Sequence, residues 1–117
     1  MARRPILRES AIQAAVIAHW RALGLPETLV AAIPNAGALG QAGLTAGLSD
    51  LLVLGGAIRI GFIELKTDRG VESEHQARFR IRCEHLGIPC VVTHGRDEPI
   101  AVLERWGVVR PHIARAA

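Results

Sequence analysis

The 117-residue sequence has only two cysteines, a single lysine and no long apolar run. No apolar run approaches the roughly 18 residues that span a bilayer, and the basic residues 1–5 are not followed by the apolar segment of a signal peptide. Cys83 and Cys90 fall in a helical and a strand pattern and have no further ligands at close spacing, which excludes a zinc site. We therefore expect a cytoplasmic protein without membrane contact, whose two thiols are buried and free.

The composition is that of a folded and slightly basic protein. Hydrophobic residues make up 50% of the chain, and 117 residues suffice for one domain with a modest core. The net charge is +3 and the pI is near 9.7. The planar fork of arginine suits phosphates, although a modest basic excess also occurs in proteins that bind no nucleic acid. Among 14 lysines and arginines only Lys66 is a lysine, so either an ammonium is needed there or a biased composition left one chance lysine.

Two apolar runs in the middle of the chain carry the charged residues of most interest. The runs 47–54 and 59–66, joined by a Gly55-Gly56 turn, predict a β-hairpin. Side chains alternate along a strand, so Glu64 and Lys66 share a face while Leu65 points into apolar packing. Asp50 starts the first strand and Glu64 ends the second, so the fold-back brings the two carboxylates together. Such a patch suits a hard cation and an anionic substrate.

The rest of the chain predicts an α/β domain with a mixed sheet flanked by helices. Residues 8–23 have a helical stripe of Ile12, Val16, Trp20 and Leu23, ended by Gly24. A second helix opens at Ser73 and stops before Gly87. The predicted order is helix, strand, strand, strand, helix, strand and a short final helix. The remaining expected segments are strands at 28–33 and 90–93, a helix at 99–105, and a tail at 106–117 in which residues 108 and 109 are extended.

Two helix starts carry polar residues with two interpretations each. Glu9 suits the positive end of a helix dipole, or it leans over the sheet and joins the carboxylates; Ser10 with Gln13 could instead cap a helix that starts one turn later. Gln76 lies at the buried end of a stripe that runs through Phe79, Cys83 and Leu86. It either caps Ser73 or hydrogen-bonds the attacking water, a phosphate or the lysine, and these roles compete for one side chain.

Surface arginines and a glycine-rich loop have two interpretations as well. Arg78 and Arg82 share one helix face, which is either solvated or in contact with phosphates. Residues 36–47 form a loop of small residues that either lies close to DNA or has no role. Its glycines lack the spacing, the following helix and the Gly-Lys-Ser/Thr of a phosphate-binding loop, so we expect no nucleotide cofactor.

The chemistry that fits these residues is phosphodiester hydrolysis. Asp50 and Glu64 would hold one or two Mg²⁺ or Mn²⁺ ions, with the backbone carbonyl of Leu65 as a further ligand. Lys66 would orient or deprotonate the attacking water, or neutralise charge in the transition state. The sequence contains no serine-histidine-acid spacing and no cysteine-histidine cluster that would favour another chemistry.

These motifs resemble a known family. Asp50 followed at a distance by Glu64-Leu65-Lys66 resembles the signature of the PD-(D/E)xK nucleases, whose fold is that of restriction endonucleases. The full set of blocks is similar to the VRR-NUC (virus-type replication-repair nuclease) branch and covers about residues 6–95, leaving 96–117 as a C-terminal extension. The blocks are Glu9, Pro34-Asn35, Gly47-Leu48-Ser49-Asp50, Ile63-Glu64-Leu65-Lys66 and Ser73-x-x-Gln76.

The resemblance implies a mixed sheet with the site at its edge and a helix on each side. It implies that Glu9, Asp50 and Glu64 are the acidic positions, and that Lys66 and Gln76 complete the catalytic set. Small relatives resemble homodimeric endonucleases that cut four-way (Holliday) junctions in bacteria or phage-infected hosts; larger ones carry extra DNA-binding domains. Ser49 replaces the usual proline, which binds no metal. The candidate DNA contacts are Arg69, Arg78 and Arg82.

Two rival functions are compatible with the same sequence. The first is a nickase, a flap nuclease or a restriction-like enzyme of the same fold. The second is a DNA-binding or assembly protein with a catalytically inert site. Intact Asp50, Glu64 and Lys66 favour an active nuclease over the second rival.

Overall fold

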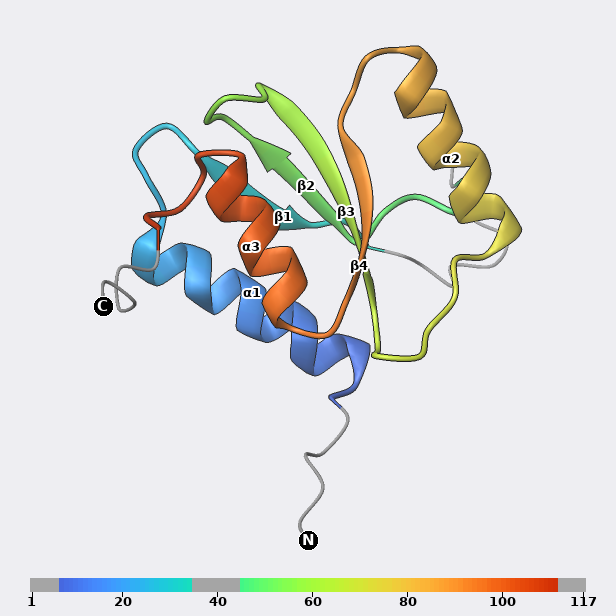
Figure 1. Cartoon of the computed structure of the whole chain (residues 1–117), viewed down its shortest axis with the longest axis horizontal. Coiled ribbons are helices and arrows are strands. Elements are labelled where there is room, and N and C mark those ends of the chain that lie inside the picture. The colour runs from blue at the N-terminus through green and yellow to red at the C-terminus, as the bar shows by residue number, and fades with distance from the viewer. Residues whose placement is uncertain (1–6, 35–44, 112–117) are drawn as a thin grey trace, which may run out of the picture.

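The computed structural model describes residues 7–34 and 45–111, and Figure 1 shows a curved sheet with helices on both sides. The predicted α/β order is confirmed, including the short final helix. The elements are α1 (Glu9–Leu23), β1 (Leu29–Ala32), β2 (Leu51–Leu54), β3 (Ile60–Lys66), α2 (Glu74–His85), β4 (Cys90–His94) and α3 (Asp97–Arg105).

The four strands lie in the order β1-β2-β3-β4. β1, β2 and β3 pair antiparallel, whereas β3 and β4 pair parallel, so the sheet is mixed as predicted. Parallel neighbours need a crossover connection, and α2 provides it between β3 and β4. β3 is therefore an interior strand with a hydrogen-bonded partner on each side.

The two faces of the sheet are covered by different helices. α1 and α3 lie together on one face (Figure 1). Ile63 and Leu65 of β3 are fully buried in one core cluster with Ile12 of α1 and Leu103 of α3. α2 lies on the other side, beside β4. There the ring of Phe62 meets that of Phe79 on α2 edge to face, with the ring centroids 5.1 Å apart. The alternation along β3 thus sends odd-numbered side chains into the main core and even-numbered ones toward α2.

The core continues beyond the predicted boundary near residue 95. Val108 and Val109 are buried, so the prediction that they belong to a tail is wrong, whereas the extended conformation expected for this pair is confirmed at Val109. The N–H of Leu25 donates to the carbonyl of Val108 over 2.9 Å, and Gly24 forms a bridge with Val109. This segment therefore closes the end of α1 and is part of the packed domain.

One further local prediction is wrong. The hairpin connection is a five-residue loop, 55–59, because Leu54 pairs with Ile60; Arg59 has a φ of +62° and belongs to the loop. Along the predicted stripe of α2, Cys83 is 3% exposed and Leu86 is 67% exposed, so burial ends before the last residue of the stripe.

Both cysteines are free, as predicted, but only Cys83 is fully buried. Burial raises the pKa of Cys90 to about 11, so this thiol stays protonated near neutral pH. Among the described residues, the helices are too short or too polar to span a bilayer.

The packing of Val108 gives a direct test of the revised core. Val108→Ala should lower the free energy of unfolding by about 2 kcal/mol, because it removes buried methyl groups and leaves a cavity. Denaturant unfolding measures this change. Arg110→Ala, two residues on and exposed, is the control and should change stability by less than about 0.5 kcal/mol. Equal effects of the two substitutions would contradict the core assignment.

Candidate metal centre at the end of the β2–β3 hairpin

Three carboxylates converge where β2 begins and β3 ends. Glu9, Asp50 and Glu64 each offer an oxygen that lies within 4.8 Å of the others. The pairing of Leu51 with Ile63 places Asp50, just before β2, beside Glu64 on β3. The fold-back expected from the sequence therefore occurs, and the first residue of α1 joins it. The site lies at the ends of interior strands.

Glu9 is the first residue of α1, and its N-cap residue, Arg8, makes no side-chain capping bond. The alternative start one turn later, with Ser10 and Gln13 as a capping box, is not adopted. Glu9 is exposed, whereas Glu64 is buried. Glu9 thus satisfies both interpretations, because it lies in the first turn of the helix and beside the other carboxylates.

Asp50 is anchored by the backbone of the neighbouring strand. Its Oδ2 accepts a hydrogen bond of 2.7 Å from the N–H of Leu65. The N–H of Phe62 and the carbonyl of Lys66 both bond toward β4, so the peptide groups of Leu65 point the opposite way, toward Asp50. The carbonyl of Leu65 consequently lies on the side of β3 that its predicted ligand role requires.

The two oxygens of Glu64 have different surroundings. The residue is 3% exposed. Its Oε2 accepts a 2.7 Å hydrogen bond from Gln76 Nε2 and lies 3.4 Å from Lys66 Nζ. Its Oε1 is buried and has no hydrogen-bond partner among the described residues. A buried carboxylate oxygen without a partner is costly, and a cation beside Oε1 would remove that cost.

Burial raises the pKa of Glu64 to about 8, and hydrogen bonding and charge repulsion from Asp50 act in the same direction. The ammonium of Lys66 opposes the shift but does not cancel it. A protonated Glu64 can donate to Asp50, whereas an ionised Glu64 leaves Oε1 without a donor. Glu64 therefore retains its proton near neutral pH in the absence of a cation.

Lys66 ends β3 and is 8% exposed. Its side chain lies on the same face as Glu64, and Leu65 between them is fully buried in the apolar core, as predicted. A buried ammonium needs a polar partner, and Glu64 Oε2 lies 3.4 Å from it. The chain thus places its single lysine inside the acidic cluster.

Gln76 serves two partners at once, and its expected role as the capping partner of Ser73 is confirmed. Its second partner is Glu64, which was not among the expected ones, so a bond to the attacking water, a phosphate or Lys66 stays a prediction. Its Oε1 accepts from the N–H of Ser73 over 2.8 Å, which completes the capping box of α2. Its Nε2 donates to Glu64 over 2.7 Å. The two ends of one amide divide the roles, a result that spacing in the sequence does not reveal.

The segment that precedes Asp50, residues 47–49, includes a close contact with the start of α2. Gly47 has a φ of +89°, and a Cβ there would collide with the backbone of His75. Ser49 is 2% exposed, with its Oγ 3.7 Å from Cys90 Sγ. Gly47 therefore allows the backbone to approach α2 closely, and Ser49 fills a buried position beside β4.

The arginines of α2 divide into two kinds. Arg80 is held by Glu72 through two hydrogen bonds of 2.8 and 3.0 Å and serves the fold. Arg78 is exposed and pairs at 2.8 Å with Glu74, itself exposed. Arg82 is also exposed, as is Arg69 in the turn after β3. The three candidate DNA contacts are thus accessible, whereas Arg80 is engaged.

His94 is a neighbour of the site that sequence reasoning missed. It pairs with Lys66 across the parallel strands, and its Nε2 lies 2.9 Å from the carbonyl of Gly70. His94 thereby ties down the turn that follows Lys66. The parallel pairing of β3 with β4 brings these residues together, and the strand pattern alone did not predict that pairing.

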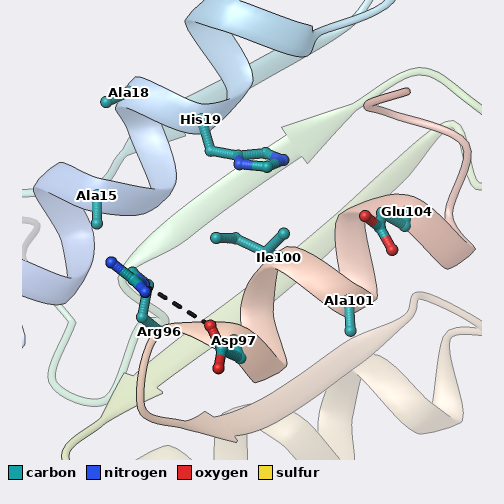
Figure 2. Close-up of a pocket in the computed structure, with 8 residues that line it drawn as sticks. All are labelled: Ala15, Ala18, His19, Arg96, Asp97, Ile100, Ala101 and Glu104. Atoms are coloured by element: carbon teal, nitrogen blue, oxygen red, sulfur yellow. Dashed lines mark ion pairs between the residues drawn. The ribbon is translucent and has the colours of Figure 1, made fainter. Parts of the chain in front are cut away.

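A cavity of about 830 Å³ lies elsewhere, between α1 and α3. Figure 2 shows His19 and Ile100 on facing helices, with Arg96 3.7 Å from Asp97 at one end. None of the three clustered carboxylates lines this cavity. Its walls carry three alanines and Ile100, together with His19, Glu104 and the Arg96–Asp97 ion pair. Because it lies apart from the carboxylate cluster, we assign it no catalytic role.

The predicted glycine-rich loop, 36–47, and the Pro34-Asn35 block fall largely outside the described residues. Only residue 34 and residues 45–47 of these blocks belong to the described part of the chain. Their expected proximity to DNA stays a prediction.

The raised pKa of Glu64 predicts how stability depends on pH. In metal-free protein, folding favours protonated Glu64, so the unfolding free energy should fall as pH rises from 4.5 toward 8, by at most about 1.4 kcal/mol per pH unit. Glu64→Gln stays neutral and should escape this loss. The gap in melting temperature between variant and wild type should therefore grow through this range in the presence of EDTA. A gap that is constant with pH, or an equal gap for the exposed Glu84→Gln, would contradict the assignment.

Comparison with known proteins supports the same architecture. The sequence matches no protein-family model and no curated protein. A solved structure described as a "VRR_NUC domain protein" is similar with a TM-score of 0.74 and 23% identity, over 90% of this chain and 98% of that one. A second, described as a "VRR_NUC domain", has a TM-score of 0.58 and 24% identity, over 83% and 94%. The chain therefore has the fold of a VRR-NUC domain.

Proposed function

We propose that this protein is a metal-dependent nuclease that hydrolyses phosphodiester bonds in DNA. The observation that carries the proposal is the buried, unpartnered Oε1 of Glu64 within a cluster of three carboxylates, next to the buried Lys66. Stability alone does not explain such a cluster, because an apolar residue would fill the space at lower cost. The similarity to structures titled VRR_NUC, whose name denotes a nuclease domain, supports the same activity.

The donor set fits Mg²⁺ or Mn²⁺. Glu9, Asp50 and Glu64 offer carboxylate oxygens and Leu65 a backbone carbonyl, and these hard ligands suit such cations. When bound, the ion would supply Lewis acidity and a water of lowered pKa. The surrounding residues hold the ligands in place: Asp50 through the N–H of Leu65, and Glu64 through Gln76.

Lys66 and Gln76 have separate roles at the reacting centre: Lys66 acts on the water or the phosphate, and Gln76 orients Glu64. The ammonium of Lys66, 3.4 Å from Glu64 Oε2, orients the attacking water or offsets charge that develops on the phosphate. Gln76 holds Glu64 in one orientation through a 2.7 Å hydrogen bond. Both side chains are fixed before substrate arrives, which lowers the cost of reaching the transition state.

The substrate is DNA, and a four-way junction cut by a homodimer is the form we favour. A domain this small offers little surface to grip a branched duplex, whereas two copies related by a two-fold axis would place two sites on opposite strands. Arg69, Arg78 and Arg82 are the proposed phosphate contacts. The free thiols fit a reducing, cytoplasmic setting.

Cleavage assays test the proposal. Wild-type protein should cut a labelled four-way junction in Mg²⁺ or Mn²⁺ with paired symmetric cuts, and Lys66→Ala should lower the rate by at least about 10²-fold. Arg105→Ala, an exposed residue in the last turn of α3, should cleave normally.

Other outcomes of these experiments would favour one of the alternative functions. Cleavage of linear duplex, flap or single strand with the junction spared would retain the nuclease and discard the resolvase. Failure to cut any substrate, together with failure to bind Mn²⁺, would favour an inert DNA-binding or assembly protein. A monomeric mass by light scattering, with and without junction DNA, would contradict the homodimer.

The arginine contacts are tested by the salt dependence of binding. Arg78→Ala and Arg82→Ala should each lower the slope of log affinity against log salt by about 0.9 for all DNA sequences, because each removes one phosphate contact. Arg105→Ala is the matched control and should leave the slope unchanged. Unchanged slopes for Arg78 and Arg82 would place these residues on a solvated face.

A further inference from the structure

We infer that Ser73 is a positioning residue of the carboxylate site, because its backbone N–H sets the orientation of the Gln76 amide against Glu64. The inference rests on the proposed metal-dependent function and explains how one ligand is held. Ser73 itself is exposed, and its side-chain and N–H hydrogen bonds within the described residues both go to Gln76. Its effect passes through Gln76.

A continuous chain of hydrogen bonds joins the helix cap to the site. The N–H of Ser73 donates to Gln76 Oε1 over 2.8 Å, and Gln76 Nε2 donates to Glu64 Oε2 over 2.7 Å. A third bond of 3.1 Å, from the backbone N–H of Gln76 to Ser73 Oγ, fixes the base of the same side chain. Hydrogen bonds therefore fix the oxygen and the nitrogen of the Gln76 amide, and a further one fixes the backbone from which this side chain extends.

Only one orientation of the amide satisfies both partners. A rotation of 180° would place Oε1 against the carboxylate oxygen of Glu64 and the amide NH₂ against the N–H of Ser73. Both contacts would then be repulsive and both hydrogen bonds lost. The N–H of Ser73 thus selects the state in which Gln76 presents a donor to Glu64.

This orientation determines which oxygen of Glu64 is left for a cation. Oε2 is occupied by Gln76 and Lys66, and Oε1 is buried without a partner in the described part of the chain. If the amide were released, Oε2 would lose a donor and the carboxylate could rotate about its terminal torsion, which is broad for glutamate. The cap of α2 therefore keeps Oε1 as the free ligand atom.

An ordinary capping role would produce a different pattern of effects, and three variants separate the two. Ser73→Ala removes only Oγ and keeps the N–H. Ser73→Pro removes both, and its ring suits the φ of −77° at this residue. Gln76→Glu keeps an acceptor for the Ser73 N–H, and therefore the cap, but replaces the donor to Glu64 with an acceptor.

Mn²⁺ binding to the full chain, measured by calorimetry, is the first readout. Affinity should fall less than about twofold in Ser73→Ala, about tenfold in Ser73→Pro and about 10–100-fold in Gln76→Glu. Equal affinities for folded Ser73→Pro and Ser73→Ala would overturn the inference. Failure of the wild type to bind Mn²⁺ would instead overturn the proposed function.

A second readout needs neither metal nor the proline variant. In wild-type protein, exchange of the Ser73 amide hydrogen should be slow, and Gln76→Ala should accelerate it at least about tenfold, whereas Gln76→Glu should not. In NMR spectra, the chemical shifts of the Gln76 side-chain NH₂ should differ from those of exposed glutamines. They should be unchanged in Ser73→Ala. Rapid exchange of the Ser73 hydrogen in the wild type would overturn the inference, whatever the metal binding.

Discussion

The buried carboxylate of Glu64 is the constraint on which the rest of this structure depends. Its Oε2 is held by one amide and one ammonium, while its Oε1 has no donor among the described residues. Each neighbouring element contributes one group around it: α1 brings Glu9, the start of β2 brings Asp50, and α2 brings Gln76. A buried carboxyl group with an unpartnered oxygen is tolerated only when the surrounding fold supplies enough stability elsewhere.

That stability comes from the other face of the same strand. Ile63 and Leu65 of β3 are fully buried against α1 and α3, together with Val108 and Val109 from beyond α3. One seven-residue strand therefore serves an apolar core on one side and a charged site on the other. The core fixes the position of β3, and alternation along β3 then fixes the positions of Glu64 and Lys66.

Patterns local to the chain predicted most of this arrangement. The period of the apolar residues gave α1, the hairpin and the shared face of Glu64 and Lys66, and the Ser73–Gln76 spacing gave the cap. The sequence did not reveal that Val108 and Val109 belong to the core, because two valines form no period and their partners at residues 23–25 are distant in the chain.

Three-dimensional context also decided the role of Gln76. Spacing indicated the cap with Ser73, but it did not indicate that the other end of the same amide donates to Glu64. Likewise, the exposure of Leu86 at the end of the stripe is not something that helical spacing indicates. Local chemistry was predictable from sequence, but the division of one side chain between two partners required the fold.

The central claim is that Glu64 Oε1, together with Glu9 and Asp50, holds a divalent cation. The most direct test is a crystal structure of the protein with Mn²⁺, in which anomalous scattering locates the ion. The account predicts an ion in contact with Glu64 Oε1 and with oxygens of Glu9 and Asp50, while Gln76 remains bonded to Oε2. An ion bound through Oε2, or bound only at another surface of the domain, would contradict it.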